Sequence, residues 1–153
     1  MQYAKKFTAL LLALLLCFCA VLTGCDSSPF QQGDVYTLKT LVYEEDGETH
    51  TVALKDTYQG QKIYENTFQI EFNNDKSLHV YVYNFGENQR SYDATYTYQP
   101  GENKNEYLVG VGLNTLRPQV KFTMTYTLGV LTVNYEGVQL VLTKSLPLSN
   151  NRK

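Results

Sequence analysis

The sequence predicts an all-β domain, an antiparallel up-and-down barrel of about eight strands, that follows an N-terminal signal peptide. Three observations predict this fold class. Apolar and polar residues alternate with a period of two in many short segments, Gly, Asn and Asp separate these segments, and no stretch beyond the N-terminal region has a convincing helical period. One face of each strand is then buried and the other is solvated, as in antiparallel sheets.

The first element in the chain is a signal sequence. Lys5 and Lys6 precede an apolar run over residues 7–22 that is rich in Leu and Ala. A run of this length suits the hydrophobic region of a signal peptide and falls short of the roughly 20 residues of a typical spanning helix. The run ends in Leu22, Thr23, Gly24 and Cys25.

These four residues resemble the lipobox of bacterial lipoproteins, in which an aliphatic residue, a small residue and Gly or Ala precede a Cys. The resemblance implies that signal peptidase II removes residues 1–24 and that Cys25 carries the lipid, with palmitate among its acyl chains. The protein is then held on the extracytoplasmic side of the cell membrane. An ordinary signal peptide with a chance Cys and an uncleaved anchor helix are the alternatives.

The composition of the remaining chain restricts its partners. Of the three cysteines, Cys17 and Cys19 lie in the apolar run, so that only Cys25 remains and no intramolecular disulfide or thiolate metal site is available. Without Lys5 and Lys6, the 13 basic residues fall to 11 against 15 acidic ones, a formal net charge of −4. An acidic surface argues against a nucleic-acid partner, which needs clustered Lys and Arg, and leaves the acyl chains as the membrane attachment.

The mature chain divides into three parts. Residues 25–33 comprise the lipidated Cys and a short, polar, Pro-containing segment that we expect to be a flexible tether. Residues 34–145 form one domain of ordinary single-domain size, and residues 146–153 are a polar C-terminal tail.

Turn residues divide the domain into hairpins. Glu45-Asp46-Gly47-Glu48, Gln99-Pro100-Gly101-Glu102 and Glu136-Gly137 each contain a residue that adopts positive φ easily. Residues 55–62 are ambiguous, with a short helical turn or a loop expected. The expected strands are 35–45, 49–54, 63–73, 78–85, 91–99, 106–113, 119–128, 130–135 and 138–144.

Hairpin-linked strands must protect the edges of their sheet, and closure into a barrel removes those edges. The connections are uniformly short, which favours an up-and-down barrel, because a Greek-key sandwich usually needs a long crossover. A two-sheet β-sandwich remains the alternative.

Several strand and turn patterns resemble the lipocalin-like domains of small bacterial lipoproteins. They are Tyr36-Thr37-Leu38, the segments 68–72 and 78–82 around an Asn-Asn-Asp turn, the segment 94–98, and the closing segment 131–143. The resemblance implies a lipocalin-like barrel. The Gly-x-Trp signature of the classical lipocalins is missing, since the chain has no Trp, and so are their paired cysteines.

No pattern of residues predicts catalysis, a metal or a cofactor. His50 and His79 are the only histidines, and they have no metal-ligand spacing. Gly110-Val111-Gly112 lies within a strand pattern and predicts a bulge or a barrel kink rather than a phosphate loop. We therefore expect the chain not to be an enzyme and to need no cofactor.

Tyrosine is the residue type that stands out, with 13 in the chain. Tyr suits a half-buried sheet, and it also suits a cavity for an amphipathic ligand or a surface for another protein. Two functions follow: a membrane-anchored module that binds a small amphipathic or lipid-like ligand, or a cell-envelope interaction or maintenance protein with a packed barrel and a protein partner. Within residues 119–128, every second side chain from Val120 to Leu128 is expected to face the interior of the barrel. The ligand-lining residues expected from the alternation are Tyr92, Tyr96, Tyr98, Phe122, Met124 and Tyr126.

Overall fold

The computed structural model describes residues 28–73, 76–85 and 89–145, and all the regular secondary structure in them is β. None of the described residues belongs to a helix that could cross a membrane. The expected lipobox, residues 22–25, and the expected tail, residues 146–153, lie outside the described residues. The strands are β1 (Val35–Glu45), β2 (Glu48–Ala53), β3 (Thr57–Tyr58), β4 (Gln61–Lys62), β5 (Phe68–Phe72), β6 (Ser77–Phe85), β7 (Arg90–Pro100), β8 (Glu106–Val111), β9 (Gln119–Thr127), β10 (Val130–Tyr135) and β11 (Val138–Lys144).

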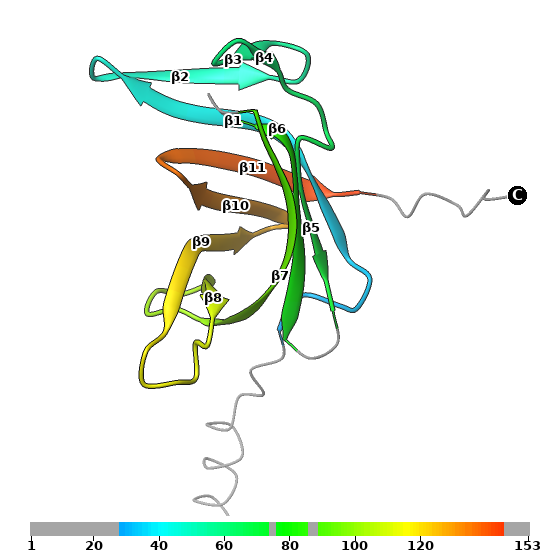
Figure 1. Ribbon diagram of the computed structural model, residues 1–153, viewed down its shortest axis with the longest axis vertical. Helices are drawn as coiled ribbons and strands as arrows, with labels where there is room; N and C mark the ends of the chain where they lie inside the picture. The colour runs from blue at the N-terminus through cyan, green and yellow to red at the C-terminus, as the bar shows by residue number, and fades with distance from the viewer. Residues whose placement is uncertain (1–27, 74–75, 86–88, 146–153) are drawn as a thin grey trace, which may run out of the picture.

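The sheet closes on itself (Figure 1). From β5 to β11 each strand pairs antiparallel with the next one along the chain, and β11 then pairs with β1 from Tyr36 to Val42. The expected closed antiparallel barrel is therefore confirmed, and the two-sheet sandwich is excluded because one continuous ladder joins the first strand to the last.

The second barrel strand is built from two separate segments. On the edge of β1 that faces away from β11, β2 pairs with Thr40–Glu45 and β5 pairs with Val35–Thr37. The two segments therefore follow one another along the same edge, and residues 54–67 are inserted between them. Counting β2 and β5 as one broken strand gives a barrel of eight strands, the expected number.

The inserted residues correct two expectations from the sequence. Residues 55–62, expected to be a helical turn or a loop, contain the small hairpin β3–β4, and the strand expected from residue 63 begins only at Phe68. The insertion packs onto the barrel, because Ile63 is buried and the backbone N–H of Tyr83 donates to the carbonyl of Thr67. It thus covers the edge of β6 that extends beyond β5.

The core occupies the inside of the barrel, and the period of two explains which residues reach it. Inward positions of neighbouring strands are fully buried, while their sequence neighbours face solvent. The middle of the barrel is filled by aliphatic side chains and one Met from six strands, which leaves the two ends to the aromatic residues. These fully buried residues include Leu38, Leu41, Ile70, Val80, Met124, Leu131, Val133, Leu140 and Leu142.

A β-bulge interrupts the alternation where β8 meets β9. The register shifts between Val109, opposite Phe122, and Gly110, opposite Val120, so that Lys121 is an extra residue on β9. The bulge expected near Gly110 is confirmed. A one-residue shift reverses which face a side chain occupies, and Val120, expected inside, is 47% exposed. Leu128 was also expected inside and is almost fully exposed in the turn after β9.

Phe30 closes one end of the barrel. Its ring is buried and stacks on Phe72 at a centroid distance of 3.9 Å. The rings of Tyr36, Tyr98, Tyr107 and Tyr126 pack edge-on around it. We call Phe30 with these five residues the aromatic plug. The segment expected to be a free tether is therefore packed against the barrel at Phe30.

Candidate functional site

At the end of the barrel opposite the plug, the wall is incomplete. β7 pairs with β8 only through Thr97–Pro100, so that residues 90–96 have no strand partner on that side among the described residues. The Thr97 hydroxyl donates to the carbonyl of Gly110 at 3.1 Å, which marks the last contact before β8 turns away. A cleft lined by side chains lies between β7 and the end of β10.

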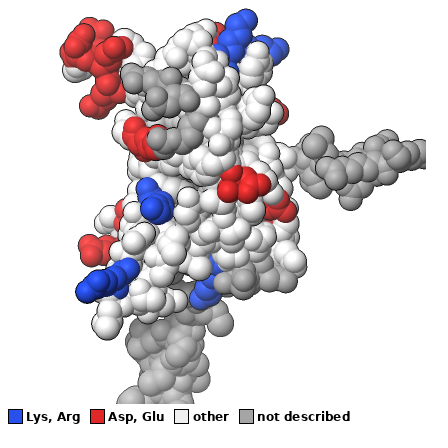
Figure 2. All heavy atoms as spheres, in the orientation of Figure 1, with Lys and Arg blue, Asp and Glu red and all other residues white. Residues whose placement is uncertain are grey.

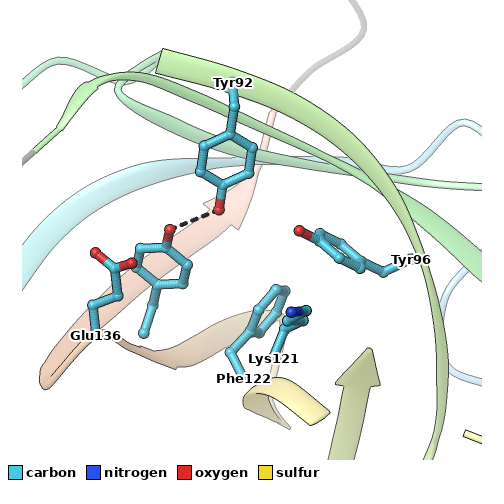
Figure 3. A pocket seen from close by; sticks show the side chains of 6 residues that line it. Tyr92, Tyr96, Lys121, Phe122 and Glu136 are labelled. Carbon is cyan, nitrogen blue, oxygen red and sulfur yellow. Dashed lines mark hydrogen bonds between the residues drawn. The ribbon is translucent and has the colours of Figure 1, made fainter. Parts of the chain in front are cut away.

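The cleft has a volume of about 320 Å³ and is lined mostly by aromatic side chains (Figure 3). The side chains of Tyr92 and Tyr96 extend from β7 toward the cleft. Phe122 lies edge-on to Tyr96, with a distance of 6.1 Å between the ring centroids. The hydroxyl of Tyr92 is 2.7 Å from that of Tyr135, and this hydrogen bond joins β7 to β10 where no backbone ladder does. Lys121 and Glu136 complete the lining.

The polar groups of the cleft differ in how far they are engaged. Burial, followed by the hydrogen bond with Tyr135, raises the pKa of Tyr92, so that its hydroxyl stays protonated well above neutral pH. Among the described residues, the Tyr96 hydroxyl and the Lys121 ammonium have no polar partner. A hydrogen-bonding group and a cation are therefore available beside two aromatic rings.

The six expected ligand residues all lie on the inward face, but the structure separates them into three sets. Tyr92, Tyr96 and Phe122 line the cleft. Tyr98 and Tyr126 belong to the aromatic plug at the other end. Met124 is fully buried in the core between them. The six residues therefore line the interior, as expected, but at three different depths, because inward residues two positions apart on a strand are roughly 7 Å apart along it.

Three residues of the cleft were missed from the sequence. Tyr135 continues the inward alternation of Leu131 and Val133, so its burial was readable, but its position opposite Tyr92 follows only from barrel closure. Glu136 lies in the turn that follows β10. Lys121 reaches the rim of the cleft because it is the extra residue of the bulge in β9. The sequence of β9 alone does not predict this position.

A second polar group lies on the outer face of β6 and β7. The Thr95 hydroxyl is 3.0 Å from Nδ1 of His79, and Nε2 of His79 is 3.5 Å from the Asp93 carboxylate. The Tyr81 ring packs on the imidazole at a centroid distance of 4.5 Å. These four residues lie on the open outer surface of the sheet, and none of them lines the cleft. Nowhere in the described segments do three or more His, Cys, Asp or Glu residues gather closely enough to hold a metal ion.

Another cleft lies beside the aromatic plug. It has a volume of about 420 Å³, and Ser28, Lys76, Tyr98 and residues 103–107 are among its lining residues. The Ser28 hydroxyl is 3.1 Å from the hydroxyl of Tyr98. This cleft therefore lies at the point where the N-terminal segment reaches the barrel.

No protein-family model and no curated protein sequence matches this chain. Two solved structures are similar in fold. An uncharacterized protein from Bacteroides eggerthii is 13% identical with a TM-score of 0.40, covering 75% of this chain and 100% of the other. A lipocalin-like protein from Bacteroides uniformis is 15% identical with a TM-score of 0.41, covering 74% and 97%. At these values neither structure carries an argument about a site, and the fold rests on the strand pairings of this chain.

Fold and site together define a class: a small eight-stranded antiparallel barrel with a filled interior and an aromatic cleft in its wall. A cleft of a few hundred cubic ångströms with rings and a few polar groups is typical of a site for a small molecule.

Proposed function

We propose that the chain is a lipoprotein anchored by Cys25 on the extracytoplasmic side of the cell membrane, and that its barrel binds a small amphipathic molecule in the cleft between β7 and β10. The ligand has a flat or short apolar body and an anionic or hydrogen-bonding group. It is smaller than a full lipid chain, because the middle of the barrel is filled by side chains.

The incomplete wall beside β7 carries the proposal. Where β8 separates from β7, the ring and the unpartnered hydroxyl of Tyr96 lie next to Phe122 and Lys121. Aromatic rings offer an apolar surface for the body of the ligand, and Lys121 and the Tyr96 hydroxyl offer contacts for its polar group. In a fully paired barrel, β8 would cover this space.

The test uses anilinonaphthalene sulfonate, a fluorescent molecule with fused rings and one anionic group. A chain that begins at Asp26 holds the whole described core, from Phe30 to Leu142, and is the protein to titrate. Tyr96→Leu removes a ring and a hydroxyl, and we expect it to weaken binding about fivefold or more, roughly 1 kcal/mol. Tyr83→Leu is the matched control, because Tyr83 is 62% exposed and lies outside the cleft.

Lys121→Gln separates the charge from the rings. It should weaken binding at low salt and have little effect at high salt, because the pair between ligand and ammonium is exposed and screened. Circular dichroism of each variant checks that the fold is retained. Binding that is equal in the wild type, Tyr96→Leu and Tyr83→Leu would remove the cleft as the site.

The anchor has its own test. Cys25→Ser should abolish incorporation of labelled palmitate and leave the precursor uncleaved, because the thiol is the acylated group. Membrane fractionation and the mass of the processed chain are the readouts. Identical processing and fractionation without this Cys would contradict the lipoprotein assignment.

A second function is supported by a different surface. Val111, Leu116 and Val120 lie at the end of the β8–β9 hairpin and are 50%, 102% and 47% exposed. Together with the filled interior, this apolar tip favours a cell-envelope interaction protein, because apolar groups exposed together often mark contacts between proteins. Absence of probe binding, with Tyr96→Leu neutral or stabilising, would favour this function over the first.

A further inference from the structure

We infer that the barrel rests on the membrane with its plugged end, and that Lys76 and the β7–β8 turn beside Ser28 face the lipid headgroups. This inference rests on the proposed lipid at Cys25. It assigns the lipid surface a defined contact face on the barrel and directs the open cleft away from the membrane.

The first step is that the chain is attached to the barrel close to the anchor. Phe30 is 7% exposed, stacks on Phe72 and is surrounded by four tyrosine rings. The Ser28 hydroxyl contacts the hydroxyl of Tyr98. Removing the Phe30 ring from water stabilises the docked segment, and we expect the segment to be docked in most molecules at equilibrium.

The second step is the reach of the remaining chain. Only three residue steps separate Cys25 from Ser28, and a fully extended chain covers about 11 Å in three steps. A tether counted from residue 33 would reach more than twice as far. The docking of Phe30 therefore holds the end of the barrel near Ser28 within about 11 Å of the lipid-bearing residue.

The third step identifies what lies at that end. Lys76 of the β5–β6 turn and Lys104 of the β7–β8 turn line the same cleft as Ser28. The end of β9 joins them, since the backbone N–H of Tyr126 donates to the carbonyl of Asn105 at 2.9 Å. Leu128, in the following turn, is 97% exposed at a φ of 50°, a conformation that costs free energy for a leucine. An exposed leucine there is suited to insertion among headgroups.

The tip of the β1–β2 hairpin lies at the far end of the barrel and is acidic. Figure 1 shows the β1–β2 hairpin at the top, while the described chain begins near the bottom. β1 alone spans about 33 Å from Val35 to Glu45. Four acidic residues occupy the hairpin tip, where Figure 2 shows the group of acidic side chains at the upper left, and an anionic bilayer would repel them. These residues are Glu44, Glu45, Asp46 and Glu48.

The experiment uses the absence of Trp from the chain, so that one introduced Trp is the only indole reporter. Glu102→Trp places it in the β7–β8 turn, and Glu45→Trp places it at the far hairpin. Both changes replace an exposed glutamate beside a turn, so they are matched in charge and in setting. The acylated full-length proteins are reconstituted into vesicles of phosphatidylcholine and phosphatidylglycerol whose acyl chains carry bromine near the headgroups.

We expect brominated lipid to quench the Glu102→Trp emission and to leave the Glu45→Trp emission unchanged. Inserting about ten Gly and Ser residues between Ser27 and Ser28 keeps the plug but lengthens the tether, and it should remove most of the quenching. Equal quenching of the two variants, or stronger quenching of Glu45→Trp, would overturn the orientation. Flotation with vesicles and palmitate labelling are measured on the same samples, and their failure would instead overturn the anchor.

Discussion

The two ends of the barrel are built from the same kind of residue and differ in what surrounds it. At the plugged end, Tyr98 on β7 is buried among Phe30, Phe72 and Tyr107. At the open end, Tyr92 and Tyr96 of the same strand remain half-buried beside a cleft. The inward direction of the side chains is identical, so the difference comes from their neighbours: β8 pairs with β7 beside Tyr98 and has left it beside Tyr96.

The plugged end is also closed by a residue that precedes the first strand of the barrel. Phe30 precedes β1, and the surrounding tyrosine rings pack against it. At the open end, Tyr58 of the insertion stacks on Phe85, which packs against Tyr135, but the space beside Tyr92 and Tyr96 stays open as the cleft. A filled end stabilises the fold, and an incompletely filled end leaves surface for a ligand. The predictions below test this division of roles.

The largest effect is expected from Phe30→Ala. It removes the central ring of the plug and leaves a cavity among five aromatic side chains, which should lower the free energy of unfolding by about 3–5 kcal/mol. Urea denaturation of the chain that begins at Asp26, followed by circular dichroism, measures it. Tyr83→Ala, at an exposed position, should change stability by less than about 1 kcal/mol. Equal midpoints for the two variants would mean that the plug does not stabilise the barrel.

A smaller effect is expected from Gly110→Ala, at the bulge where β8 separates from β7. A Cβ at Gly110 would lie 2.0 Å from the backbone oxygen of Gln119, and backbone cannot move aside as a side chain can. We expect a loss of about 1–3 kcal/mol and weaker binding in the cleft, because the divergence of β8 must change.

The matched control is Gly101→Ala at the plugged end, where the new Cβ meets the flexible side chain of Glu106. Its effect on stability should be smaller. A neutral Gly110→Ala would show that the bulge does not fix the separation of the two strands.

The sequence correctly predicted which side chains face the interior of most strands. It did not predict which side chains of other strands they contact. Tyr92, Tyr96, Tyr98, Phe122, Met124 and Tyr126 all point inward, because the period of two is local and depends only on strand geometry. The prediction failed at Val120, where the bulge adds a residue to β9 and reverses the face. Bulges depend on the pairing of two strands, which one strand's pattern does not contain.

Non-local arrangements account for the other differences. The sequence predicted Phe30 in a free segment because its neighbours are polar, although the burial of its ring depends on residues of β1, β5, β7, β8 and β9. The cleft joins β7 to the end of β10, and this proximity arises only on closure. The break between β2 and β5 was likewise hidden, since each segment alone reads as an ordinary strand.

A third prediction concerns the hydroxyl pair that bridges the open end. Tyr92→Phe removes the hydrogen bond from β7 to Tyr135 and should lower stability by about 1 kcal/mol, less than Phe30→Ala, because a hydroxyl and not a ring is lost. Tyr135→Phe and the double variant complete a mutant cycle, in which a coupling of about 0.5 kcal/mol or more is expected. Tyr83→Phe is the neutral reference. Additive effects in the cycle would contradict a bridge between the two strands.

The smallest effect is spectroscopic and compares the two ends through the ionisation of their tyrosines. Burial is the main cause that raises the pKa of Tyr36 in the plug and of Tyr92 in the cleft, with hydrogen bonds to Tyr126 and Tyr135 adding to it. Exposed tyrosines ionise near pH 10. Absorbance at 295 nm should therefore show a late phase to which these two contribute, together with Tyr81, whose pKa is raised by burial and by the nearby carboxylate of Glu71.

The sign of the linked stability change follows from the same shift. Below about pH 10 both groups are protonated in the folded and the unfolded chain, so these two groups contribute no pH dependence to the free energy of unfolding there. Above it the unfolded chain loses these protons first, and stability falls as pH rises toward the raised pKa of the folded state. Tyr92→Phe and Tyr36→Phe should each reduce the late phase. Loss of the late phase with Tyr36→Phe but not with Tyr92→Phe would show that water reaches Tyr92 freely, and that the open end is wetter than the hydroxyl bridge implies.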